Sequence, residues 1–149
     1  MTNVHLHRAS VLINTMPEDQ ESALWLALQD AVVMQLHLAF EAGLRELAES
    51  YGVKSPGLEG LRRFNPDMAE LGLVDQLLAD STSWLSQNER QWQQLMQGEA
   101  GGASVQMAQA DQLITSDNRI LHSDTNFYRS SLQNMQALIE QFRQNSQFY

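Results

Sequence analysis

Residues Ser22 to Tyr51 decide the fold, and they read SALWLALQDAVVMQLHLAFEAGLRELAESY. The stretch contains no proline and a single glycine, and it is dense in the residues that favour helices most strongly. It therefore predicts one long helix, about 45 Å from end to end. We expect the rest of the chain to pack around this central helix.

Apolar residues cover more than one side of the central helix. One stripe runs along it at spacings of three and four. Its members are Val33, Leu36, Phe40, Leu44, Leu47 and Tyr51. The first half also carries apolar residues that cannot share a single face: Leu24, Trp25, Leu26, Leu28, Val32 and Met34. A helix exposed to water along one whole side does not need this pattern, so we expect neighbours on at least two sides.

The composition favours a single all-α domain covering residues 1–149. Hydrophobic residues make up 43% of the chain and charged residues 18%, while β-branched residues are sparse and leucine, alanine and glutamine abound. A chain of this length buries enough surface to fold without metals or disulfides. Because the sequence has no cysteine, it excludes a disulfide scaffold, thiolate catalysis and cysteine-ligated metal sites.

The formal net charge of −9 comes from 18 acidic and 9 basic residues. Such a charge repels nucleic-acid phosphates and anionic membrane surfaces, which argues against nucleic acid as a partner. The apolar run at residues 31–40 is shorter than the roughly 20 residues that span a bilayer. Residues 1–19 lack the pattern of a secretory signal. We therefore expect a cytoplasmic protein without a membrane-spanning helix.

A first helix is predicted before the central one. Residues 3–15 form a short stretch of periodic apolar residues, which Pro17 should end. Thr15, followed three residues later by Glu18, resembles a capping box that starts the next helix at once. The two helices should then be antiparallel neighbours with a very tight connection.

After the central helix, the chain is predicted to cross one end of the bundle and return. Glycine and proline at residues 52–57 end the helix, and residues 58–72 hold at most one or two helical turns. Spacings of three and four then predict a second long helix over residues 73–97. Glycines begin a long loop over residues 98–118, with a helical turn around residues 105–113.

A last helix completes the predicted fold. Ser123 or Asp124 can cap its N-terminus, and its apolar stripe runs from Tyr128 to Phe142. The sequence therefore predicts an all-α, antiparallel bundle of four to five helices around the long central helix. We expect its core to contain Phe40, Leu44, Leu47, Trp84, Leu85, Trp92, Leu132, Met135 and Ile139.

His37 and Glu41 are the candidate metal ligands. They lie four residues apart on the central helix and share one face, and the interiors of helical bundles do hold such ligands. The simpler interpretation is a pair of neighbours on a solvated strip, because the chain lacks the Glu-x-x-His motifs of a carboxylate metal site. We therefore predict no cofactor, and a helical metal-dependent enzyme using these two residues is an alternative.

The sequence contains no recognisable catalytic motif. It has no G-x-S-x-G nucleophile turn, no phosphate-binding loop and no dinucleotide fingerprint. A non-enzymatic protein is therefore the favoured prediction, either a self-associating module or one that binds another protein. The chain ends in Phe148 and Tyr149, two aromatic residues that could dock on such a partner.

Two stretches carry a family resemblance: LALQDAVVMQLHLAFEAGLRELAESYGV at residues 26–53 and YRSSLQNMQALIEQFRQNSQFY at residues 128–149. Together they resemble a small uncharacterised family of gammaproteobacterial proteins of about this length. The first stretch also resembles the long helix of HEPN bundles, the "higher eukaryotes and prokaryotes nucleotide-binding" domains. That resemblance implies an up-and-down helical bundle, frequent homodimers and, in active members, a metal-independent ribonuclease that uses an arginine and a histidine.

Arg119 and His122 come nearest to the HEPN motif. Only two residues separate them, whereas the motif implies four to six. Asp117 and Asp124 flank the pair with negative charge, which weakens phosphate binding. We therefore expect that Arg119 and His122 form no ribonuclease site, and a divergent RNA- or nucleotide-binding protein with a degenerate motif is the alternative.

Overall fold

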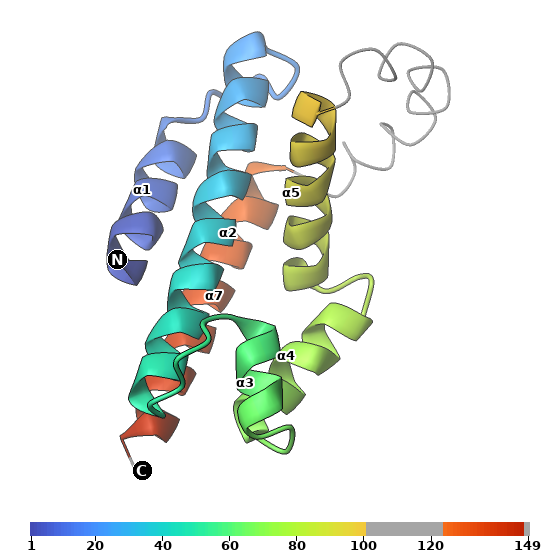
Figure 1. Cartoon of the computed structure of the whole chain (residues 1–149). Helices are drawn as coiled ribbons and strands as arrows, with labels where there is room; N and C mark the ends of the chain where they lie inside the picture. Colours follow the sequence, from blue (N-terminus) through green and yellow to red (C-terminus); the bar gives the residue numbers. More distant parts are fainter. Residues whose placement is uncertain (101–123, 148–149) are drawn as a thin grey trace.

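The structure, a computed structural model, describes residues 1–100 and 124–147. Helices are the only regular secondary structure in this part of the chain, so the all-α class is confirmed (Figure 1). There are six described helices: α1 (Thr2–Thr15), α2 (Ala23–Ser50), α3 (Leu58–Phe64), α4 (Ala69–Ala79), α5 (Trp84–Ala100) and α7 (Thr125–Ser146).

The long helix α2 lies at the centre of the molecule. In Figure 1, α1 lies on one side of α2, α5 lies on the other, and α7 runs behind it. Helix α7 runs parallel to α2, whereas α1 and α5 run antiparallel to it (Figure 1). The short helices α3 and α4 lie near the end of the molecule where α2 finishes. Every long described helix therefore contacts α2.

The boundaries of α2 follow from its capping residues. The Ser22 hydroxyl accepts a hydrogen bond from the backbone N–H of Trp25, which satisfies one of the free donors at the helix start. After the helix, Gly52 adopts a positive φ of 68°, a conformation that favours glycine. The long helix predicted over residues 22–51 is confirmed.

The predicted capping box at Thr15 and Glu18 is wrong. The Thr15 hydroxyl donates a hydrogen bond to the backbone carbonyl of Val11, so Thr15 belongs to the last turn of α1. Residues 16–22 then connect α1 to α2 before Ser22 provides the cap.

The single helix predicted over residues 73–97 is also wrong, because the chain breaks between α4 and α5. Asp80 accepts hydrogen bonds from the backbone N–H and the hydroxyl of Thr82. Ser83 accepts one from the backbone N–H of Ser86 and thereby caps α5. These short polar side chains compete with the helix backbone for hydrogen bonds and end α4 at Ala79.

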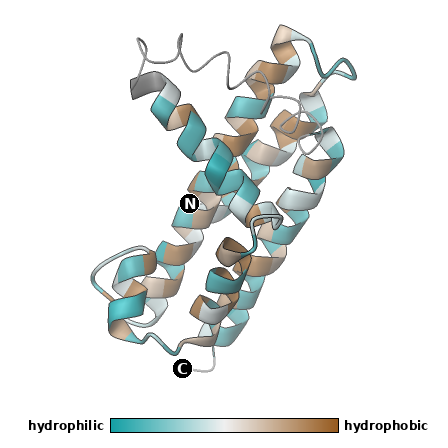
Figure 2. Ribbon diagram, turned by 90° about the vertical axis from the view of Figure 1, so that its right-hand side faces the viewer, coloured by the Kyte–Doolittle hydropathy of each residue, from teal (hydrophilic) through white to brown (hydrophobic). Residues whose placement is uncertain are grey.

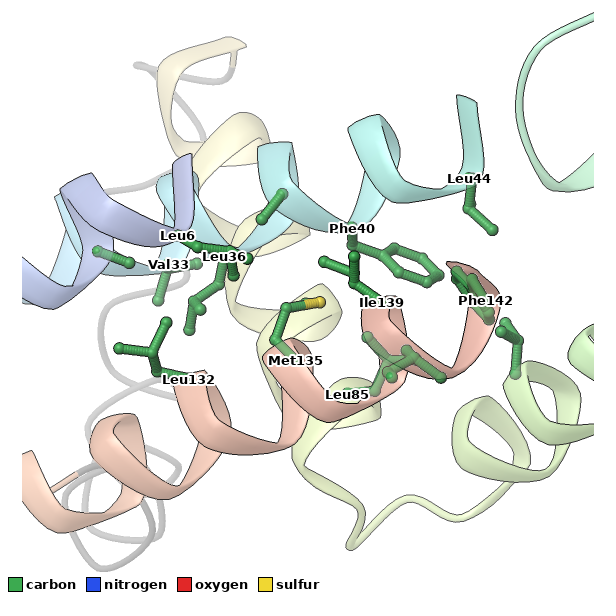
Figure 3. Close-up of a cluster of buried hydrophobic side chains, with 14 of the residues drawn as sticks. Leu6, Val33, Leu36, Phe40, Leu44, Leu85, Leu132, Met135, Ile139 and Phe142 are labelled. Atoms are coloured by element: carbon green, nitrogen blue, oxygen red, sulfur yellow. The ribbon is translucent and has the colours of Figure 1, made fainter. Parts of the chain in front are cut away.

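The core contains buried apolar side chains from all six described helices, and Figure 3 shows part of it. Of the nine residues predicted to form it, seven are buried, whereas Trp84 and Trp92 are partly buried at its edge. Gly43 faces α7 without a side chain, and a Cβ atom there would lie 3.1 Å from Cγ1 of Ile139. The glycine therefore allows α2 and α7 to approach closely.

Among the described helices, α2 is the one that is long and apolar enough to cross a membrane. Length and composition alone therefore do not separate it from a membrane-spanning helix, contrary to the expectation from residues 31–40. Of the most apolar stretch of 18 residues in α2, 44% is buried inside the fold. This buried part is explained by the contacts of α2 with α1, α5 and α7.

Candidate functional site

His37 lies in a polar and aromatic cluster between α2 and α5. Its Nδ1 atom lies 3.0 and 2.9 Å from the two carboxylate oxygens of Glu89. Its ring stacks on Trp92, with ring centroids 4.5 Å apart and an angle of 15° between the planes. Only 15% of the His37 side chain is exposed. Glu89 and Trp92 therefore hold the imidazole in one orientation and join α2 to α5.

Glu41 does not belong to this cluster. It is exposed, and the carboxylate that contacts His37 comes from Glu89 on α5. Within the described residues, no group of three or more His, Asp or Glu side chains is placed to hold a metal ion. The sequence contained one hint of the true partners: Glu89 and Trp92 lie three residues apart and so share a face of α5.

A second polar cluster lies inside the bundle, where α2, α5 and α7 meet. Nε2 of Gln29 donates to the Tyr128 hydroxyl at 2.8 Å, and this hydroxyl donates to Oε1 of Gln91 at 2.9 Å. Tyr128 is completely buried, and the two glutamines are almost as deeply buried. One turn away, Nε1 of Trp25 donates to the Thr125 hydroxyl at 3.1 Å. These bonds fix the register of three helices, because their geometry permits little sliding.

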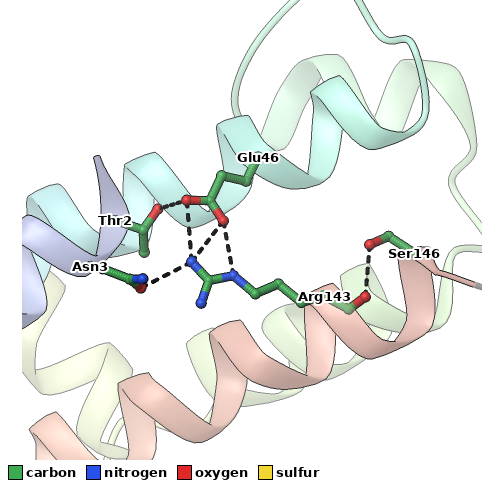
Figure 4. Close-up of polar contacts among 5 residues, drawn as sticks. All are labelled: Thr2, Asn3, Glu46, Arg143 and Ser146. Atoms are coloured by element: carbon green, nitrogen blue, oxygen red, sulfur yellow. Dashed lines mark hydrogen bonds and ion pairs between the residues drawn. The ribbon is translucent and has the colours of Figure 1, made fainter.

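A third cluster joins the ends of α1, α2 and α7 (Figure 4). Nε and Nη2 of Arg143 donate to Oε2 of Glu46 at 3.1 and 3.0 Å, and the Thr2 hydroxyl donates to Oε1. Nη2 of Arg143 also donates to Oδ1 of Asn3 at 3.0 Å. Burial raises the pKa of Glu46, but the hydrogen bonds from Thr2 and Arg143 and the charge of Arg143 together lower it below its ordinary value.

The side of α2 that faces away from α7 carries a second apolar row. Its members recur at spacings of three and four: Leu24, Ala27, Ala31, Met34 and Leu38. We call this set the outer row. Leu24 is 59% exposed and Met34 38%, Ala27 is exposed, and the other two are half-buried.

The surroundings of α2 explain why the outer row is open. Helices α1 and α5 flank α2 and α7 lies behind it, so no described helix covers the remaining side (Figure 1). By contrast, α5 has a mostly hydrophilic outer side (teal in Figure 2). The prediction that α2 has neighbours on at least two sides is confirmed by its contacts with α1, α5 and α7.

A comparison with known protein families supplies one match. A family profile covers residues 1–149, which is the whole chain. The chain belongs to DUF6586, a family of unknown function. No curated protein and no solved structure matches it. The expectation of an uncharacterised family is confirmed.

Two pairs of candidate residues lie outside the described part of the chain. Arg119 and His122, the pair nearest to a HEPN motif, belong to residues 101–123. Phe148 and Tyr149, the candidate docking residues, are the last two of the chain. Of the predicted site residues, the structure therefore places His37 and Glu41.

Proposed function

We propose that this protein is a helical self-association module, in which the outer row of α2 binds the outer row of a second copy. The supporting observation is that α2 carries a second apolar stripe in addition to the one buried against α7. Exposed apolar residues in a continuous row are typical of surfaces that bind another protein.

The pattern of the outer row fits a second helix. Alternating spacings of three and four form the seam between two packed helices. Ala27 and Ala31 lie at the centre of the row, and their small side chains let the backbone of a second helix come close. Leu24 and Met34 lie on either side of the alanines and supply the larger contact area.

The same pattern is self-complementary, as a two-fold interface between identical chains requires. An antiparallel pairing centred between Ala27 and Ala31 brings Ala27 of each copy beside Ala31 of the other. It also brings Leu24 of each copy beside Met34 of the other. The next two positions of the row are Glu41 and Arg45, whose exposed charges end the apolar seam. Homodimers are also what the resemblance to HEPN bundles implies.

The charge of the chain favours an apolar contact over an electrostatic one. Two copies that each carry a formal charge of −9 repel each other at long range. Added salt screens this repulsion while leaving apolar contacts intact. Self-association through the outer row should therefore be at least as strong at high salt as at low salt.

The test is light scattering coupled to size-exclusion chromatography over a range of concentrations. We expect the wild-type mass to rise from that of a monomer to that of a dimer. Ala31→Glu should weaken the association by about tenfold or more, because each dimer would bury two added carboxylates. Glutamate is a good helix former, so the monomer should keep its helical far-ultraviolet circular dichroism spectrum.

The matched control is Gln133→Glu, which adds the same charge at an exposed position of α7. It should associate like the wild type. A wild type that stays monomeric at every concentration would disprove self-association. Equal association of Ala31→Glu and the wild type would show that the contact lies elsewhere.

A further inference from the structure

Two buried polar side chains lie one helical turn away from the hydrogen bonds that join Gln29, Tyr128 and Gln91. Asn88 on α5 and Ser131 on α7 are both completely buried. Within the described residues, Oδ1 and Nδ2 of Asn88 and Oγ of Ser131 have no hydrogen-bond partner. Buried amides and hydroxyls in folded proteins nearly always bond to another protein group or to ordered water.

The register of α5 and α7 brings these two side chains to the same level. The helices run antiparallel, and the hydrogen bond from Tyr128 to Gln91 joins them (Figure 1). Asn88 precedes Gln91 by three residues, and Ser131 follows Tyr128 by three. One turn in the same direction therefore leads from that bond to Asn88 on one helix and to Ser131 on the other.

The side chain that α2 contributes near this level of the core is short. The bond between Gln29 and Tyr128 and the parallel course of α2 and α7 place the buried Val33 near the level of Ser131. The neighbouring levels toward the end of α2 contain larger side chains, such as Phe40 and Met135 (Figure 3). Valine and serine fill less of the space between three helices than these residues do.

We infer that Asn88 and Ser131 form an internal hydration site, in which water bridges the Asn88 amide and the Ser131 hydroxyl between α5 and α7. The amide offers donors and an acceptor, and the hydroxyl offers both, so water can bond to each side chain. In the structure no direct hydrogen bond joins Asn88 to Ser131, although both side chains are buried at the same level. Bridging water gives hydrogen-bond partners to the buried polar atoms of Asn88 on α5 and Ser131 on α7.

A crystal structure of the full chain, at a resolution that shows ordered water, tests this site directly. We expect electron density for water within hydrogen-bonding distance of both the Asn88 amide and the Ser131 hydroxyl. A direct bond between the two side chains with no water at this level would overturn the inference. So would another side chain that takes up the amide of Asn88.

A nuclear magnetic resonance experiment tests the same site in solution. In the wild type, magnetisation should transfer from a long-lived water to the backbone amides next to Ser131. Asn88→Leu has a similar volume and no hydrogen-bonding atoms, so this signal should be lost. Gln94→Leu, at an exposed position of α5, should keep it. The wild-type spectrum decides the question even if Asn88→Leu fails to fold, because a wild type without the signal would contradict the inference.

Discussion

The interface between α2 and α7 changes character along its length. Near the end of α2 it is apolar, with Phe40 buried close to Phe142 and Gly43 in close contact with Ile139 (Figure 3). Near the start of α2 it is polar, because Gln29 bonds to Tyr128. Apolar contacts remove more apolar surface from water, whereas hydrogen bonds require defined distances and angles. The apolar half therefore contributes more to stability, and the polar half fixes how the helices are aligned.

The largest expected effect tests the apolar half. Phe40→Ala should lower the free energy of unfolding by about 3 to 5 kcal/mol, because it leaves a cavity in a closely packed core. Urea denaturation followed by circular dichroism measures this change. Phe64→Ala is the control, since Phe64 is 54% exposed, and it should cost less than about 1 kcal/mol. An unchanged midpoint for Phe40→Ala would place Phe40 outside the core.

A second change tests the close approach of α2 and α7. Gly43→Leu should cost about 1 to 3 kcal/mol, because the new side chain would overlap Ile139 and push the helices apart. Gly72→Leu is the control, because a Cβ atom at that helical position meets nothing within 4 Å. There leucine should be neutral or stabilising, since it favours helices over glycine. Thermal unfolding compares the two, and equal midpoints would refute the close approach.

A third change tests the polar half. Tyr128→Phe removes the hydroxyl that joins Gln29 to Gln91, so each of these buried glutamines loses one hydrogen bond. The expected loss is about 1 to 3 kcal/mol, measured by urea denaturation. Tyr51→Phe is the matched control, because its half-buried hydroxyl makes a longer bond of 3.3 Å to Glu70. If the two variants lose equal stability, the buried hydrogen bonds of Tyr128 stabilise the fold no more than the longer bond of Tyr51 does.

The sequence predicted the long helices well and their breaks poorly. α2 and α7 have apolar stripes that recur over many turns, so periodicity alone locates them. The break between α4 and α5 depends on local hydrogen bonds of Asp80 and Ser83. Leu77, Ser81 and Trp84 follow one another at spacings of four and three, as in a continuous helix. The spacing therefore does not reveal the break. Capping chemistry competes with periodicity here, and the spacing of side chains does not measure that competition.

The clusters between helices were harder to predict for a different reason. His37 and Glu41 share a helix, so sequence spacing places them together, but the contact of His37 is Glu89 on another helix. The bond from Arg143 to Glu46 joins residues 97 positions apart. Which faces of two helices meet depends on their relative register, and that register comes from packing rather than from either helix alone.

The smallest expected effect concerns Glu46, beyond the apolar half of the interface. In the folded chain its pKa lies below the ordinary value of 4.5, so the ionised form favours folding. The resulting stabilisation is complete above about pH 4.5 and is lost as the pH falls through the folded-state pKa. Since about a third of both side chains of the pair is exposed, Glu46→Gln should cost less than about 1 kcal/mol at pH 7.

Urea midpoints of the wild type and Glu46→Gln, measured from pH 7 into the acid range, test this expectation. The two curves should differ at neutral pH and converge below pH 4.5, where protonation removes the charge of Glu46. When both proteins also carry Arg143→Gln, the difference between their midpoints at neutral pH should shrink. Arg143 supplies the opposite charge to Glu46 and hydrogen bonds in addition to the one from Thr2. A difference that stays constant down to low pH would show that the ionised carboxylate of Glu46 does not stabilise the joined ends of α1, α2 and α7.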